Sequence, residues 1–247
     1  MTLAAQGLAL PGRLHDLSLE LRPGEVTAIC GPNGAGKSSL LASLAGLERA
    51  ALPAVSLDGR PLSQWRAGER ARAIGYLPQS AEVAWDVSVE TLVSLGRLPW
   101  PGAPAGETAQ AIAAALAAMD LDGLRHRPIS RLSGGERARA LLARVLATGP
   151  RWLLADEPLA NLDLAHAASL MHRLRAQSGA GAGVVVVLHD LAAAMNFASR
   201  VVVLDQGRIA ADGAPGIALA PDVIARVWGV RARWLGASGA VALAVEG

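Results

Sequence analysis

The segment that decides the fold of this chain is Gly31-Pro32-Asn33-Gly34-Ala35-Gly36-Lys37-Ser38. Its spelling, G-x-x-x-x-G-K-S, is the P-loop, in which the backbone N–H groups of a glycine-rich loop surround nucleotide phosphates. A P-loop needs a strand before it and a helix after it. The apolar run 26–30 predicts that strand, and the apolar-rich segment 39–47 predicts the helix. The G-x-G-x-x-G spelling of a dinucleotide site is not present.

Lys37 is the only lysine among the 23 basic residues of the chain. A compact ammonium on a flexible stem reaches between two phosphates as a point charge, where the wide planar fork of an arginine does not fit. We therefore predict that Lys37 contacts the β- and γ-phosphates and that the Ser38 hydroxyl ligates Mg²⁺. The rest of the predicted nucleotide-binding set is Gly31, Pro32, Asn33, Gly34, Ala35, Gly36 and Ser39.

Length and composition agree with a soluble nucleotide-binding enzyme. A chain of 247 residues can form one large α/β domain, or a core with a small subdomain. No apolar run has the length of a transmembrane helix and no signal peptide begins the chain, so we expect it to stay in the cytosol. Cys30 is the only cysteine, which excludes a disulfide within the chain. The net charge of +2, with one Tyr and one Phe, argues against a nucleic-acid partner.

Apolar runs alternate with helical stretches along the chain, which is the βα pattern of a mainly parallel sheet. The strands expected from these runs are 17–21, 26–30, 73–77, 152–155, 184–188 and 201–204. Between the third and fourth of them, the segment 89–147 is alanine-rich and helical in pattern. It is therefore expected to be a helical insertion in the α/β core.

A second motif ends the expected strand 152–155 with two adjacent carboxylates, Asp156 and Glu157. Such a strand end is ordinarily only solvated surface. Ligands of open α/β sheets bind at the carboxyl ends of the strands, so a P-loop in the same sheet would lie beside this pair. Asp156 could then hold Mg²⁺, and Glu157 could orient and deprotonate an attacking water.

The third motif, Leu132-Ser133-Gly134-Gly135-Glu136, begins an expected helix that extends to about Leu146. Two glycine amides and a hydroxyl at a helix N-terminus form an anion site. The same residues also fit an ordinary capping box, with Ser133 as N-cap and Glu136 at N3. Because it lies between a P-loop and an Asp-Glu strand end, this LSGGE spelling resembles the signature of ATP-binding-cassette (ABC) ATPases.

The resemblance covers nearly the whole chain and implies a fold. It implies an α/β protein with a RecA-like P-loop NTPase core, a mainly parallel sheet, an N-terminal antiparallel β part and an inserted α-helical subdomain. The expected organisation is a single ABC ATPase domain over 1–247, in which 1–85 and 148–247 form the core and 86–147 form the helical subdomain with the signature.

The resemblance also implies roles for single residues. Gln79 matches the Q-loop glutamine, Asn161-Leu162-Asp163 matches the D-loop, and His189 matches the switch histidine that contacts the γ-phosphate. The implied catalytic set is Lys37, Gln79, Glu157 and His189, and the implied Mg²⁺ ligands are Ser38, Gln79 and Asp156.

In this family two subunits pair head to tail and sandwich two ATP molecules. The resemblance therefore implies that Ser133, Gly134, Gly135, Glu136 and Asp163 act across the interface with a second copy of the ATPase. It further implies permease subunits in the membrane and a peripheral position on the cytoplasmic side of the inner membrane.

The segment 88–100 is similar to a stretch common in importers for iron–siderophores, haem and cobalamin, and 57–62 and 228–231 are also similar to that group. This similarity favours a metal-chelate importer, which works with a periplasmic or surface substrate-binding protein. An exporter ATPase is the main alternative. A soluble ABC protein is a weaker one, since it would normally carry a long coiled coil or two cassettes.

One position departs from the family pattern. An aromatic residue usually stacks on adenine about 25 residues before the P-loop lysine, yet residues 1–30 contain no Phe, Tyr or Trp. Arg13 or His15 could stack on the base instead, or Leu10 could pack against it. Stacking of a base on an aromatic ring contributes about 1–3 kcal/mol. We therefore predict weaker or less base-selective ATP binding.

Overall fold

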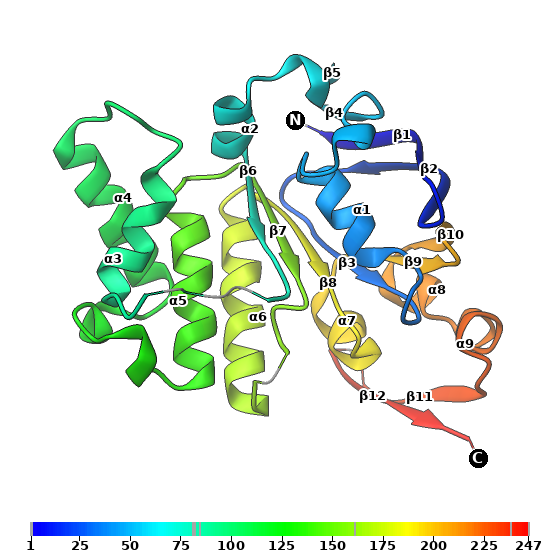
Figure 1. Cartoon of the computed structure of the whole chain (residues 1–247). Helices are drawn as coiled ribbons and strands as arrows, with labels where there is room; N and C mark the ends of the chain where they lie inside the picture. The colour runs from blue at the N-terminus through cyan, green and yellow to red at the C-terminus, as the bar shows by residue number, and fades with distance from the viewer. Residues whose placement is uncertain (1, 81–82, 84, 161, 238, 247) are drawn as a thin grey trace.

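A six-stranded sheet forms the centre of the computed structural model, which describes all residues except 1, 81–82, 84, 161, 238 and 247 (Figure 1). The strand order is β10-β9-β3-β8-β7-β6. Neighbours pair in parallel except for β10, which is antiparallel to β9. The strands are β3 (Val26–Cys30), β6 (Ile74–Leu77), β7 (Trp152–Asp156), β8 (Gly183–Val187), β9 (Arg200–Asp205) and β10 (Arg208–Gly213). The expected α/β fold with a mainly parallel sheet is confirmed.

A second, antiparallel sheet lies at the N-terminal end, as expected, with the strand order β2-β1-β4-β5. Its strands are β1 (Leu3–Leu10), β2 (Leu14–Leu21), β4 (Val55–Leu57) and β5 (Arg60–Pro61). The expected strand 17–21 begins three residues earlier, at Leu14. The pairing of β1 with β2 shifts register between Ala5 and Leu8, where Gly7 has a φ of 59°. This irregularity breaks the alternation of apolar residues in β1, so the sequence pattern did not predict that strand.

Helices cover both faces of the six-stranded sheet. α1 (Lys37–Leu44) packs against β7 and β8, and α6 (Leu164–Gly179) packs against β8 and β3. Successive strand residues point to opposite faces. Trp152 and Leu154 therefore belong to the cluster under α1, whereas Leu153 belongs to the cluster under α6.

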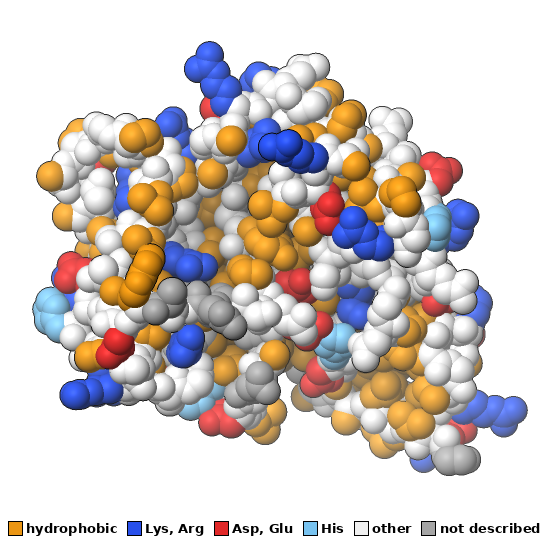
Figure 2. Space-filling view, viewed as in Figure 1, with side chains coloured by type: hydrophobic (Ala, Val, Ile, Leu, Met, Phe, Trp, Pro, Cys, Tyr) orange, Lys and Arg blue, Asp and Glu red, His pale blue; other side chains and the backbone are white. Residues whose placement is uncertain are grey.

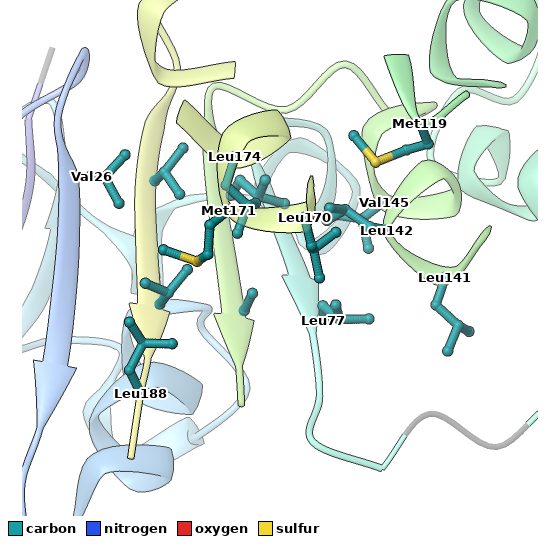
Figure 3. Close-up of a cluster of buried hydrophobic side chains, with 14 of the residues drawn as sticks. Val26, Leu77, Met119, Leu141, Leu142, Val145, Leu170, Met171, Leu174 and Leu188 are labelled. Carbon is teal, nitrogen blue, oxygen red and sulfur yellow. The ribbon is translucent and has the colours of Figure 1, made fainter. Parts of the chain in front are cut away.

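The expected helical segment contains α3 (Val89–Ser94), α4 (Ala105–Ala118) and α5 (Gly134–Leu146). These helices stand beside the sheet in Figure 1, and α5 packs against α3, α4 and α6. Figure 3 shows Leu170, Met171 and Leu174 of α6 between the strands on one side and Leu142 and Val145 of α5 on the other. The hydrophobic core therefore continues from the sheet into the helical region.

The remaining elements are short. They comprise α2 (Ala67–Ala73), α7 (Leu191–Phe197), α8 (Pro215–Ala218), α9 (Pro221–Trp228), a terminal hairpin of β11 (Ala232–Ala237) and β12 (Ala240–Val245), and 3₁₀ turns at 49–51, 62–64, 95–97, 122–124 and 129–131. The side chain of Asn196 in α7 bonds the backbone of Val241 twice, at 2.8 and 2.9 Å, and so fastens β12 to that helix. Within the described residues, no helix combines the length and apolar character needed to cross a bilayer.

Candidate active site

The P-loop connects the end of β3 to the start of α1, at the carboxyl edge of the parallel strands. Gly36 is the N-cap of α1 and has a φ of 97°, which only glycine adopts readily. The space around it is also filled, because a Cβ at this position would lie 2.7 Å from the carbonyl oxygen of Arg13. Glycine is required here for both reasons.

Lys37 is the first residue of α1 and is only 6% exposed. Its ammonium donates hydrogen bonds to the carbonyl oxygens of Gly31 and Pro32, each at 2.8 Å. Burial lowers the pKa of the Lys37 amine, and the nearby carboxylate of Glu157 opposes this effect. Since an ammonium has three donors, one remains for a ligand in the loop.

Asp156 is the last residue of β7 and is 3% exposed, and its Oδ1 atom has no hydrogen-bond partner among the described residues. Burial raises the pKa of this carboxyl group, and a hydrogen bond with Ser38 opposes the rise. A buried carboxylate oxygen without a partner, next to a hydroxyl, is a donor set that suits Mg²⁺. The residues present therefore fit the metal expected from the sequence.

Glu157 follows Asp156 and has a φ of 49°, a left-handed conformation that costs energy for a residue with a side chain. Its Oε2 accepts a hydrogen bond from Nε2 of Gln79 at 2.7 Å. Its Oε1 lies 2.5 Å from Nε2 of His189. Three strand ends therefore meet at one carboxylate, because Gln79 follows β6 and His189 follows β8.

Lys37, Glu157 and His189 line a cavity of about 310 Å³, whereas Gln79 and Asp156 line a separate one. The lining of the first cavity combines the P-loop and α1 with two acid–base side chains and the turn between β1 and β2: Asn33, Gly34, Gly36, Lys37, Ser38, Ser39, Glu157, His189, Gly12 and Arg13. Charged and histidine side chains gather in the hollow of this face near α7 (Figure 2). The cavity joins a cation and helix amides, which bind phosphates, to a carboxylate that can activate water.

Ser133 caps α5, as the sequence pattern allowed. Its Oγ accepts a hydrogen bond from the Glu136 amide at 3.2 Å, and the Glu136 carboxylate accepts one from the Ser133 amide at 2.8 Å. In the described part of the chain, the residues 133–136 do not line the P-loop cavity. Gly134 instead lines a separate cavity of about 230 Å³ with Gln79 and Glu157. One chain therefore does not bring its signature and its P-loop into one pocket.

Comparison with known proteins identifies the family. A family model described as "ABC transporter" matches residues 14–160, which is more than half of the chain. The chain belongs to the ABC transporter family. Members of this family bind ATP, so this chain is an ATP-binding protein.

Curated relatives of this ABC protein share almost half of its residues. The hemin import ATP-binding protein HmuV of Rhodococcus jostii is 45% identical over 93% of this chain and 80% of its own length. The protein of the same name from Streptomyces coelicolor is 48% identical over 91% of this chain and 82% of its own length.

Solved ABC structures share the fold. The cbiO1 protein of Clostridium perfringens, part of the transporter complex cbiONQ, has a TM-score of 0.79 and 27% identity, over 91% of this chain and 92% of that one. The cassette MJ0796, solved as a dimer in a post-hydrolysis state with ADP and Pi, has a TM-score of 0.72 and 25% identity, over 86% of this chain and 98% of that one.

The segment that matches the ABC D-loop precedes α6. Asn161 lies outside the described residues. Asp163 is the N-cap of α6 and accepts a hydrogen bond from the amide of His166 at 2.8 Å, and its carboxylate also holds Nδ1 of that residue at 2.7 Å. A Cβ added at Gly135 would overlap the His166 ring. His166 therefore joins the D-loop to the signature helix, a contact that the sequence analysis missed because the Asp-x-x-His spacing indicates only the cap of α6.

The three residues considered for the adenine position lie in different environments. Leu10 is 1% exposed in the core of the antiparallel sheet, so the expectation that it could pack against a base is wrong. His15 donates its amide to the carbonyl oxygen of Gly207 and is not part of the cavity lining. Arg13 lines the cavity.

Proposed function

We propose that this chain is the ATP-hydrolysing subunit of a membrane importer for a metal chelate, with hemin as the cargo. The similarity of segment 88–100 to chelate importers and the names of the relatives from Rhodococcus and Streptomyces support this proposal. The observation that carries the hydrolytic part is the position of Glu157, held between Gln79 and His189 at the P-loop cavity.

Each side chain then has a task that its position allows. Lys37 and the first amides of α1 bind the β- and γ-phosphates. Glu157 orients the attacking water and accepts its proton, while His189 contacts the γ-phosphate and Gln79 fixes the carboxylate. Ser38, Asp156 and Gln79 would hold Mg²⁺, which when bound neutralises charge on the phosphates.

The complete site needs a second copy of the chain. Since residues 133–136 lie outside the P-loop cavity of their own chain, we propose that they close the cavity of a partner in a head-to-tail dimer. The amides at the start of α5 and the Asp163 loop would then face the γ-phosphate side of the partner's nucleotide. ATP would hold the two copies together by bridging them, and hydrolysis would release them.

The proposed assembly also contains permease subunits in the inner membrane, with the ATPase dimer on the cytoplasmic side, and a periplasmic or surface substrate-binding protein. The test is to purify the native complex, identify its membrane subunit and reconstitute it in vesicles. ATP-dependent hemin accumulation in the direction of import, lost with the Glu157→Gln variant, is the expected result. A complex that moves its cargo outward, or an ATPase without a membrane subunit, would refute the importer.

A further inference from the structure

The turn between β1 and β2 is held by a hydrogen bond within its own backbone. Arg13 donates its amide to the carbonyl oxygen of Leu10 at 2.9 Å, with Pro11 second and Gly12 third in the turn. Gly12 has a φ of 68°, and this arrangement is the pattern of a type II turn. The sequence Leu10-Pro11-Gly12-Arg13 therefore sets the position of the Arg13 backbone.

The backbone of Arg13 is also packed against the P-loop. Its carbonyl oxygen would lie 2.7 Å from a Cβ at Gly36 and 2.6 Å from a Cβ at Gly207. The amide of Gly207 in turn donates to the carbonyl oxygen of Ala35 at 3.1 Å. Three loops therefore meet at this point, and the position of residue 13 relative to the phosphates is constrained from two sides.

The side chain of Arg13 is held by a carboxylate. One guanidinium nitrogen lies 2.7 Å from Oε1 of Glu48, and the other lies 3.4 Å from Oε2. Glu48 belongs to the segment that follows α1. The Arg13 side chain remains 49% exposed. Such a two-point contact orients a guanidinium plane and leaves its faces open.

Among the described residues that line the cavity, two side chains carry a broad delocalised plane: Arg13 and His189. The ring of His189 is engaged with Glu157. A guanidinium stacks on flat π-systems and is weakly hydrated, so it can take the place of an aromatic ring under a nucleobase.

We propose that Arg13, oriented by Glu48, is the base-binding residue of this ATPase and that its guanidinium stacks on the face of the nucleobase. This inference rests on the proposed ATP site at Lys37. Because every base has a π-face, stacking of this kind discriminates little between adenine and guanine.

The test measures dissociation constants by calorimetry on the full chain with Mg²⁺, in a Glu157→Gln background that prevents turnover. The ligands are ATP, GTP and inorganic tripolyphosphate, which has the phosphates but no base. The variants are Arg13→Ala, Arg13→Lys and Arg13→Tyr, together with Glu48→Gln. The matched control is Arg49→Ala, since Arg49 is an exposed arginine next to Glu48 that does not line the cavity.

We expect Arg13→Ala and Arg13→Lys to weaken ATP and GTP binding about 3- to 30-fold, the range of a cation–π contact, and to leave tripolyphosphate binding unchanged. Glu48→Gln should give a smaller loss of the same kind. Arg13→Tyr should bind ATP at least as tightly as the parent, and Arg49→Ala should match the parent for every ligand.

Two results would overturn the proposal. If Arg13→Lys binds all three ligands like the parent while Arg13→Ala weakens the binding of tripolyphosphate as much as the binding of ATP, the guanidinium contacts phosphate and not the base. If Arg13→Ala binds all three ligands like the parent, the residue has no role in binding. Failure of the proposed function is a separate result, in which the parent chain binds neither ATP nor tripolyphosphate.

Discussion

The carboxylate of Asp156 lies in a place that is unfavourable for a charge. It is buried and ionisable, and one of its oxygens lacks a partner within the described structure. A pKa raised by burial means that the folded protein favours the protonated form more than the unfolded chain does. The free energy of unfolding that this pKa shift adds is fully present at a pH below the ordinary pKa of an aspartate. It is lost as the pH rises through the raised pKa of Asp156.

The Asp156→Asn variant should therefore be more stable than the parent at neutral pH without nucleotide. In a domain of this size, an increase in melting temperature of about 2–4 °C corresponds to an increase of about 1 kcal/mol in the free energy of unfolding. The difference between the two proteins should shrink as the pH falls through the raised pKa of Asp156, because the carboxyl group then becomes protonated. Thermal unfolding of both proteins across this pH range is the measurement, and a variant that melts below the parent at neutral pH would contradict it.

Glu157→Gln should separate binding from hydrolysis. The amide keeps the size of the side chain but cannot accept a proton from water, so turnover should fall by at least about 10²-fold. ATP affinity should stay close to that of the parent, because Lys37 and the loop amides are unchanged. Steady-state phosphate release and ATP titration of the same preparation test this. Hydrolysis at the parental rate would remove Glu157 from the role of base.

Lys37→Arg tests why an arginine-rich chain has a lysine here. The exchange keeps the positive charge of the side chain. The planar guanidinium does not fit the place where the single Nζ atom of Lys37 donates to the carbonyl oxygens of Gly31 and Pro32. We expect turnover to fall by at least about 10²-fold, the order found for loss of one electrostatic stabiliser. Arg49→Lys, the reverse exchange at an exposed site, is the control and should leave turnover unchanged.

At the scale of elements, the buried parallel strands were the easiest to predict from sequence. The valine run that forms β8 and the leucine run that forms β7 are apolar on both faces, and the structure places both within one residue of the expected bounds. β1 was missed because the irregular pairing near Gly7 breaks its alternation. The hairpin of β11 and β12 was missed because Val241, Leu243 and Val245 alternate with alanines, so β12 shows no alternation of apolar and polar residues.

Gly135 in α5 and His166 in α6 are in contact, although β7 lies between the two helices in the sequence. An Ala at position 135 should push the His166 ring away and lower stability by about 1–3 kcal/mol, as overpacking does. The double variant Gly135→Ala, His166→Ala should recover part of the loss, because the smaller side chain leaves room for the new methyl group. Melting temperatures of both variants and of His166→Ala test the coupling, which is absent if the effects simply add.

In the molecule as a whole, the sequence motifs predicted which side chains come together at the carboxyl ends of the strands. Asp156 ends β7, and Lys37, Glu157, Gln79 and His189 come after the ends of parallel strands of the same sheet, so their meeting follows from topology. The contacts of Arg13 with Glu48 and of Asp163 with His166 depend on how loops pack, which spacing alone does not give.

The proposed head-to-tail dimer predicts complementation between inactive chains. A site built from two copies needs Lys37 from one and Ser133 from the other. Mixing Lys37→Arg with Ser133→Arg should therefore form dimers that keep one intact site, and hydrolysis should recover to about a quarter of the parental rate if pairing is random and the sites are independent. Each variant alone is the control. A mixture no more active than its components would argue against a shared site.

Because Lys37 is the only lysine, chemical labelling of its amine can report on the state of the P-loop. Apart from the chain terminus, an amine-reactive label has one side chain to modify, and that group lies inside the P-loop with two of its hydrogens already engaged. The rate of acylation at this single position thus measures how often the loop opens to solvent. A phosphate ligand that accepts a hydrogen bond from the third hydrogen would slow the same reaction. The labelling rate therefore measures nucleotide occupancy directly, without a fluorophore or an engineered cysteine.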